Sequence, residues 1–407
     1  MRYNKIISDI SLAETLSEVL DKWRYYSDDI SGCRLIFAGE GKNHFQGLDA
    51  YRNFGKSVHL RSLFHSDKIF FIDNSILKQH EKSKQIEIPI DYSICFETNS
   101  ASHLKALMEG SRDKIITKLA EAIDEIIRKD YHYDYAFYLI ENAKKFSKVC
   151  NNENETASTF AKVKAMELFR TLNRDKYLKE GIFCSIFDDE TLAREACNSI
   201  SSVLIQEDAP FQKVHETMYL LLLKMSIIHL SSNRNYRKKA AEFIEFMMTE
   251  LKTIFVRELV IAVEFFKSGQ NLSFFSRIQR KCGEVNALKA LSNMAWDLTY
   301  MRFLEKISET GMGLNARYFV PFALSCDNDL MELFDLYPIK MCFFTSDNPM
   351  PIPLGKKSIN TYLIENDCYD ENIWSEYRTR PKSNKRLDVS RMICDIESML
   401  EPMVRNN

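Results

Sequence analysis

The chain has little of the two residues that punctuate turns, with only 12 Gly and 9 Pro in 407 residues. Collagen-like and low-complexity chains, and β architectures built on many tight turns, need far more of both. Hydrophobic residues make up 45% and charged residues 28%, which is the composition of a globular protein. The scarcity therefore favours a helix-rich globular fold, and the length favours two domains or one domain with a large insertion.

Neither sign of charge is in excess, because 55 Lys and Arg oppose 57 Asp and Glu. A chain of this balance has no overall attraction for nucleic acid or anionic lipid, so any such contact must use a local patch. Long hydrophobic runs are also missing. The longest, Met218 to Leu230, is interrupted by Lys224 and is too short to span a bilayer. We therefore expect no membrane contact.

Paired metal-binding or disulfide motifs are absent as well. The ten cysteines contain no CxxC pair, and the eight histidines contain no HExxH or zinc-type spacing. The amino-terminal residues show no apolar region of signal-peptide type. Scattered cysteines in such a chain are most simply reduced core thiols, which predicts a cytoplasmic protein.

Strand-like and helical patterns alternate in two parts of the chain. Short runs rich in Ile and Phe predict strands over Arg34 to Gly39, Lys68 to Ile72 and Ile86 to Phe96. Helical periodicity then runs from about Ser111 to Gly269, with a predicted loop at Asn151 to Thr156.

Beyond Gly269, helix and strand alternate again. We expect a helix over Leu288 to Ile307, a strand over Phe319 to Ser325, a short helix from Asp329 and a strand over Ile339 to Phe344. This alternation favours a small parallel sheet flanked by helices, so the predicted fold class is α/β and helix-rich. The expected organisation is a mixed α/β segment 1–85, an α/β domain from 86–110 and 254–345, an all-helical insertion 111–253, and an irregular tail 346–407 ending in a helix.

Two acidic motifs in the last third of the chain draw attention. Asp297 lies in the helical sequence AWDLTYMRFLE among apolar neighbours, where a carboxylate is costly unless it is paired, caps a helix or binds a metal. Asp327 and Asp329 follow the predicted strand FVPFALS, and ligands bind at the carboxyl ends of strands in parallel α/β sheets. Either aspartate taken singly could instead be the N-cap of the next helix.

The order of these motifs resembles the PIN-like nuclease family. In that family a strand ends in an acid followed by small or polar residues, a helix brings a Glu, a later helix begins with an Asp, and a further strand ends in T-x-D-x-[DE/N]. The segment AWDLTYMRFLE resembles the third element and LSCDND the fourth, with Ser325 in place of Thr. The helix FVRELVIAVEFF resembles the second element, with Glu258 as its acid.

Two segments compete for the first element. FFIDNSIL ends an apolar strand at Asp73, whereas YSICFETNSASHL follows the family's strand and Thr-Asn pattern more closely but has Glu97 where Asp is usual. We favour Glu97, whose extra methylene shifts the carboxylate outward, and keep Asp73 as the alternative.

The resemblance implies metal-assisted hydrolysis of phosphodiesters. Catalytic roles would go to Glu97, Glu258, Asp297 and Asp327, and one or two Mg²⁺ or Mn²⁺ ions would be held by Glu97 or Asp73 with Asp297, Asp327 and Asp329. The implied substrate is single-stranded RNA, and the implied role that of a ribonuclease, such as a toxin or defence effector. The alternative is a catalytically degenerate module that binds a protein regulator, or a second copy, through the helical insertion.

A local basic run lies close to these motifs in the sequence. Arg277, Arg280 and Lys281 follow the aromatic pair Phe274 and Phe275, and cations beside aromatic rings suit a nucleic-acid backbone and its bases. Such runs are also typical of a solvated face. We assign these three residues as candidate nucleic-acid contacts.

Overall fold

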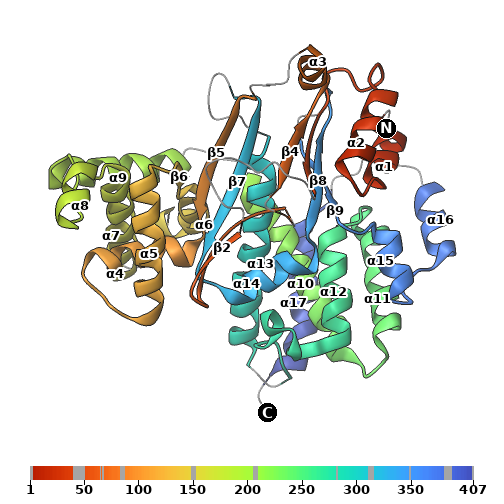
Figure 1. Ribbon diagram of the computed structural model, residues 1–407. Coiled ribbons are helices and arrows are strands. Elements are labelled where there is room, and N and C mark those ends of the chain that lie inside the picture. Colours follow the sequence, from red (N-terminus) through yellow and green to blue (C-terminus); the bar gives the residue numbers. More distant parts are fainter. Residues whose placement is uncertain are drawn as a thin grey trace.

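The computed structural model describes residues 3–39, 51–64, 66, 68–82, 88–147, 153–204, 210–280, 283–309, 316–347, 350–379 and 387–405. Within these ranges the helices α1 to α17 surround two separate β-sheets (Figure 1). The helix-rich α/β class predicted from the sequence is confirmed.

The larger sheet is mixed. Its order is β2 (Tyr51–Phe54), β3 (Val58–Ser62), β7 (Tyr318–Ser325), β5 (Ile90–Phe96) and β6 (Tyr133–Asp134). The strands β7, β5 and β6 run parallel, as predicted, but β3 pairs antiparallel with both β7 and β2. The β2–β3 pairing has a local reason: the two strands form a hairpin around Gly55, which has a φ of 70° that favours glycine, and a tight hairpin can only be antiparallel.

The second sheet is antiparallel throughout. Its order is β4 (Ile69–Ile72), β1 (Arg34–Ala38), β8 (Ile339–Phe344) and β9 (Ile352–Gly355). Leu35 and Phe37 of β1 face a small core shared with α1 (Asn4–Ser11) and α2 (Leu16–Tyr25), whereas Ile36 faces the main core. A strand covered on both faces needs apolar residues at every position, which accounts for the continuous apolar run.

Most of the helices between β5 and β7 gather on one side of the larger sheet (Figure 1). They are α4 (Thr98–Met108), α5 (Lys114–Lys129), α6 (Ala136–Ser147), α7 (Glu153–Arg170), α8 (Arg174–Glu180) and α9 (Asp189–Leu204). In contrast, α10 (Pro210–Ser231) and α11 (Tyr236–Phe246) pack with helices of the carboxyl-terminal part of the chain. Two expectations are corrected here. The stretch predicted as all-helical contributes the strand β6, and α7 already begins at Glu153, inside the predicted loop.

The carboxyl-terminal part of the chain supplies the remaining helices. They are α12 (Val256–Ser268), α13 (Glu284–Ile307), α14 (Asn328–Leu336), α15 (Ile359–Glu365), α16 (Glu371–Thr379) and α17 (Val389–Val404). The tail predicted as irregular therefore contains β9 and two helices before α17.

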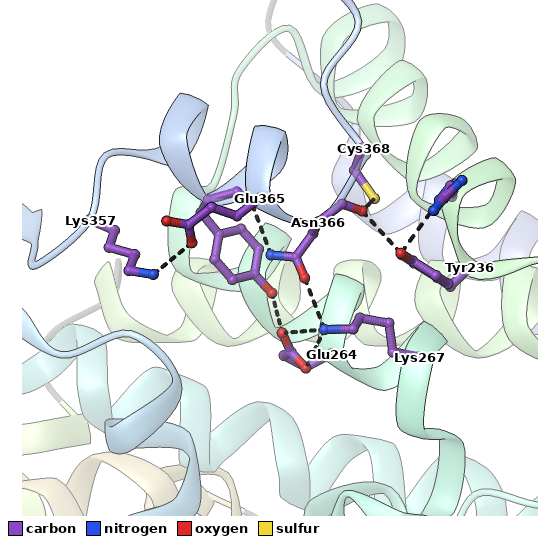
Figure 2. A network of polar contacts seen from close by, with 9 residues as sticks. Tyr236, Glu264, Lys267, Lys357, Glu365, Asn366 and Cys368 are labelled. Carbon is purple, nitrogen blue, oxygen red and sulfur yellow. Dashed lines mark hydrogen bonds and ion pairs between the residues drawn. The ribbon is translucent and has the colours of Figure 1, made fainter.

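The helix α15 is held on α12 by polar contacts (Figure 2). The Tyr362 hydroxyl donates to Glu264 at 2.5 Å, and the Lys267 ammonium donates to Asn366 at 2.9 Å. Across the described ranges, no helix is both long enough and apolar enough to cross a membrane.

Candidate active site

The parallel strands β5 and β7 end beside each other. Phe96 pairs with Leu324, the Glu97 N–H donates to the Leu324 carbonyl at 3.0 Å, and the Ser100 hydroxyl donates to the same carbonyl at 2.7 Å. The Ser325 hydroxyl consequently lies 3.5 Å from Oε2 of Glu97. Side chains at the two strand ends therefore share one edge of the sheet, where ligands bind in parallel α/β folds.

Glu97 is a buried carboxyl that also caps a helix. Its side chain is 3% exposed, and Oε1 accepts the Asn99 N–H at 2.8 Å at the start of α4. Burial raises the pKa of Glu97 to about 8, although the Asn99 hydrogen bond opposes the rise, and the negative charges of Glu141 and Asp327 add to it. At neutral pH this carboxyl is therefore poised to hold or release a proton.

Asp327 is the N-cap of α14. Its Oδ1 accepts the N–H groups of Asp329 at 2.8 Å and Leu330 at 3.2 Å, and its own N–H donates to the Ser325 hydroxyl at 2.9 Å. The capping role that the sequence allowed is thus present, and it uses one carboxylate oxygen. The same side chain is close enough to Glu97 to raise the pKa of that carboxyl, so the cap and the acidic site share a residue.

Asp297 reaches the site from the middle of α13. The Tyr300 hydroxyl, one turn along the helix, donates to the Cys95 carbonyl at 2.6 Å and holds α13 against the end of β5. Asp297 is partly buried, and within the described ranges it has no side-chain hydrogen bond or ion pair. Burial raises its pKa well above the usual value, and the charges of four further acids add to the rise, namely Glu97, Asp327, Glu141 and Asp329.

Glu141 was not among the predicted site residues. It lies on α6, directly after β6, and the pairing of β6 with β5 brings this helix to the strand ends. Its Oε2 accepts the Thr98 hydroxyl at 2.5 Å; burial raises its pKa, while Thr98 and Lys145 lower it. The sequence signal that could have identified Glu141 is the one that identified Asp297, namely an acid among apolar neighbours in a helix. Glu141 lies inside the stretch that we interpreted as a helical insertion, and it was therefore not considered.

Asp329 lies at the outer side of this group. Its Oδ1 accepts the hydroxyl of Ser273 at 2.7 Å, and the Ser273 backbone N–H donates to Glu332 at 3.1 Å. We call Glu97, Glu141, Asp297, Asp327 and Asp329 the acidic cluster. Its charges act on one another, and among the described residues no Lys or Arg is paired with Asp297 or Glu97.

Glu258 lies outside the acidic cluster. It is fully buried on α12, where its carboxylate pairs with Arg302 at 2.5 Å, and Arg302 also contacts Glu305 at 2.9 Å. Glu305 in turn pairs with the buried Arg257. A buried acid with two of its hydrogen bonds made to a guanidinium is a structural ion pair.

Asp73 also lies outside the acidic cluster. It starts α3 (Asn74–Lys82), accepting the Ser75 N–H at 2.7 Å, and its Oδ2 accepts the Tyr318 hydroxyl at 2.6 Å. Tyr318 is the first residue of β7, whereas Asp327 follows the last, so a strand of roughly 3.3 Å per residue separates the two acids. Of the two candidates for the first acid, Glu97 is the one that lies with Asp297 and Asp327.

The predicted basic contacts lie on the loop after Ser273. Arg277 and Arg280 are exposed, and Arg280 donates to the Leu230 carbonyl at 2.6 Å; Lys281 lies outside the described residues. The neighbouring rings of Phe274 and Phe275 are buried in the core and are not available for stacking on bases. Any base stacking must therefore use other side chains.

The donor chemistry of the acidic cluster fits Mg²⁺ or Mn²⁺, because both prefer hard carboxylate oxygens. The unpaired charge of Asp297 fits a cation as well. The side chains, as they lie in the described ranges, do not bring three His, Cys, Asp or Glu residues into a metal-holding arrangement. Binding would therefore require side-chain rotation in the acidic cluster. No protein-family model, curated protein or solved structure matches the chain.

Proposed function

We propose that the protein is a metal-dependent nuclease of PIN-like type that hydrolyses phosphodiesters. The observation that carries this proposal is Asp297, a partly buried carboxylate without a partner among the described residues. The charges of Glu97, Asp327 and Asp329, which follow the ends of two parallel strands, and of Glu141 on α6 act on it. Like charges held together at a cost in stability are typical of sites that work on a cation or a proton.

Glu97, Asp297 and Asp327, with Glu141 beside them, are the residues that would hold Mg²⁺ or Mn²⁺. When bound, such an ion supplies Lewis acidity toward a phosphate oxygen and lowers the pKa of a water molecule. The contribution of the protein itself is to hold the acidic side chains in place. The helix caps made by Glu97 and Asp327 fix the backbone of both acids, and a carboxyl with a pKa of about 8, as for Glu97, suits proton transfer near neutral pH.

The proposed substrate is single-stranded RNA, with a role as a toxin or defence effector following from the family resemblance. The net charge of −2 gives no overall attraction for RNA, so the exposed Arg277 and Arg280 are the proposed local contacts. They follow Ser273, which contacts Asp329 of the acidic cluster, so a strand guided by them would pass close to the acids.

The second candidate is a catalytically inactive member of the same class that acts as an interaction module. It is favoured by the arrangement of the acidic cluster, which holds no metal-ready group of three among the described residues. In that case burial, which raises the pKa of both Glu97 and Asp297, would favour their protonated forms over metal binding, and the acidic cluster would be only a remnant.

Labelled single-stranded RNA incubated with purified protein separates the two candidates. The nuclease proposal expects cleavage with Mn²⁺, none with EDTA, and a loss of about tenfold or more in Asp297→Asn. Asp188→Asn is the matched control, because Asp188 is an exposed cap on the distant helix α9 and Asn caps equally well. Equal cleavage by wild type and Asp297→Asn would refute the assignment, and absence of cleavage in every reaction would favour the interaction module.

A further inference from the structure

A cavity of about 680 Å³ lies where the start of α12 and the end of α13 meet α10, and none of the five acids of the acidic cluster lines it. Its walls are largely apolar, with contributions from Phe211, Val214, Phe255, Tyr337 and Pro351. Small-molecule sites typically occupy about 300–1,000 Å³ and combine apolar walls with a few polar groups. The cavity has both the size and the lining of such a site.

Arg257 is the unusual polar residue of this cavity. It is 2% exposed, and its Nη2 pairs with Glu305, but Nε and Nη1 are buried without an acceptor among the described residues. An unsatisfied buried donor costs about 1–3 kcal/mol, and more when it is charged. The Arg257 guanidinium therefore has two donors without acceptors, and an anion bound in the cavity would supply these acceptors.

Most of the charged residues that line the cavity are cations. Four cations line it, namely Lys213, Arg257, Arg302 and Lys306, against the single carboxylate of Glu305. Behind the wall, Glu258 pairs with Arg302 and Glu309 pairs with Lys306. Arg302 and Lys306 thus have carboxylate partners, whereas Nε and Nη1 of Arg257 have no acceptor among the described residues.

The other cavity beside α12 lacks these features. It measures about 320 Å³ and is lined by residues that include Lys357, Tyr362, Glu365 and Asn366. The polar groups of these four residues contact one another or the adjacent helix, as in the Lys357 to Glu365 pair at 2.6 Å (Figure 2). Of these two cavities, the Arg257 cavity is the one whose lining includes a buried guanidinium with donors that lack an acceptor among the described residues.

We propose that the Arg257 cavity binds a small organic anion that has an apolar body and one acidic group. The acidic group would accept hydrogen bonds from Arg257, which lines the cavity and whose Nε and Nη1 are buried without an acceptor among the described residues. A turn of the guanidinium toward the cavity would make these hydrogen bonds. The apolar body would contact Phe211, Phe255 and Tyr337. This site is separate from the acidic cluster and does not depend on the nuclease proposal.

A matched pair of fluorescent probes tests the charge requirement. One is 8-anilinonaphthalene-1-sulfonate, and the other is N-phenyl-1-naphthylamine, which has the same aromatic body without the anion. We expect the wild-type protein to bind one equivalent of the sulfonate about tenfold or more tightly than the amine, since one charge-assisted hydrogen bond is worth about 1.5–3 kcal/mol. Equal affinity for the two probes would overturn the proposal.

Three variants locate the binding. Arg257→Gln should lose the preference for the anion, and Thr217→Trp, which fills the cavity from α10, should lose binding of both probes. Ser202→Trp on the exposed face of α9 is the control and should bind as wild type. Each variant is first checked for cooperative urea unfolding. Because Thr217→Trp leaves Arg257 intact, its retention of sulfonate binding in a folded protein would refute the site even if Arg257→Gln fails to fold.

Discussion

Glu97 and Ser325 meet with 3.5 Å between Oε2 of the one and the hydroxyl of the other, although 228 positions separate them in the sequence. Ser325 also accepts the Asp327 N–H at 2.9 Å. One hydroxyl therefore links the acid that follows β5 to the acid that follows β7. This link defines the centre of the acidic cluster, and the first predictions concern the acids on either side of it.

The stability of the metal-free protein should fall as the pH rises through the range in which Glu97 ionises. A carboxyl whose pKa is raised from 4.5 to about 8 binds more protons in the folded state, so its contribution is complete below about pH 4.5 and lost by about pH 8. Urea unfolding in EDTA between pH 5 and 9 should show wild type losing about 1–3 kcal/mol relative to Glu97→Gln. Parallel profiles for the two proteins would contradict the raised pKa.

Substitutions at Asp327 should separate its role as the N-cap of α14 from its proposed role as a metal ligand. Asp327→Asn keeps a good N-cap, so its stability in EDTA should stay within about 0.5 kcal/mol of wild type, whereas Asp327→Ala should lose about 1 kcal/mol. Both variants should lose Mn²⁺ binding by calorimetry, because both remove the charge. If Asp327→Asn binds Mn²⁺ as wild type does, the residue is only a cap.

Asp297→Asn should stabilise the protein in the absence of metal. The substitution removes a partly buried charge that faces other acids and has no partner among the described residues, so we expect a gain of about 1 kcal/mol at pH 8 in EDTA. Thermal unfolding with and without Mn²⁺ measures this. The metal should stabilise wild type and leave the variant unchanged, and a destabilised variant would show that the charge is needed for the fold.

Glu258→Gln should affect folding and leave Mn²⁺ affinity unchanged. Glu258 is fully buried and holds Arg302, so removing its charge leaves a guanidinium short of a partner at a cost of about 3–5 kcal/mol. Urea unfolding measures the loss, with the exposed Glu250→Gln as a control near zero. A stable Glu258→Gln variant with weakened Mn²⁺ binding would restore Glu258 to the site.

The local features of the fold were the ones that could be predicted from the sequence. The strands β1, β5, β7 and β8 and the helices α13 and α17 leave clear apolar patterns, because each has at least one face fully buried. The two-residue strand β6 leaves no pattern of its own. The sequence also did not reveal which strands pair with each other, because pairing depends on tertiary packing rather than on periodicity. The pairing of β8 with β1 in the second sheet is an example.

The acidic residues were predicted in the same uneven way. Glu97, Asp297 and Asp327 follow strands or lie on an apolar helix face, so their sequence context identified them. Glu258 has an equally apolar context, but its partner Arg302 lies 44 positions away and no local signal reveals the pair. Glu141 was not predicted because its position near the other acids depends on the pairing of β6 with β5, which the sequence does not reveal.

The pairing of β5 with β7 sets the order in which the protein can acquire its site during synthesis. Glu97 leaves the ribosome early, but Asp297, Ser325 and Asp327 follow only after the helices α4 to α13 have been made. An unfinished chain therefore carries the first acid without the others, and long-range parallel pairing is slow to form. A truncated product that ends before α13 would therefore lack Asp297, Ser325 and Asp327, and the proposed activity would require that most of the chain has been completed and folded.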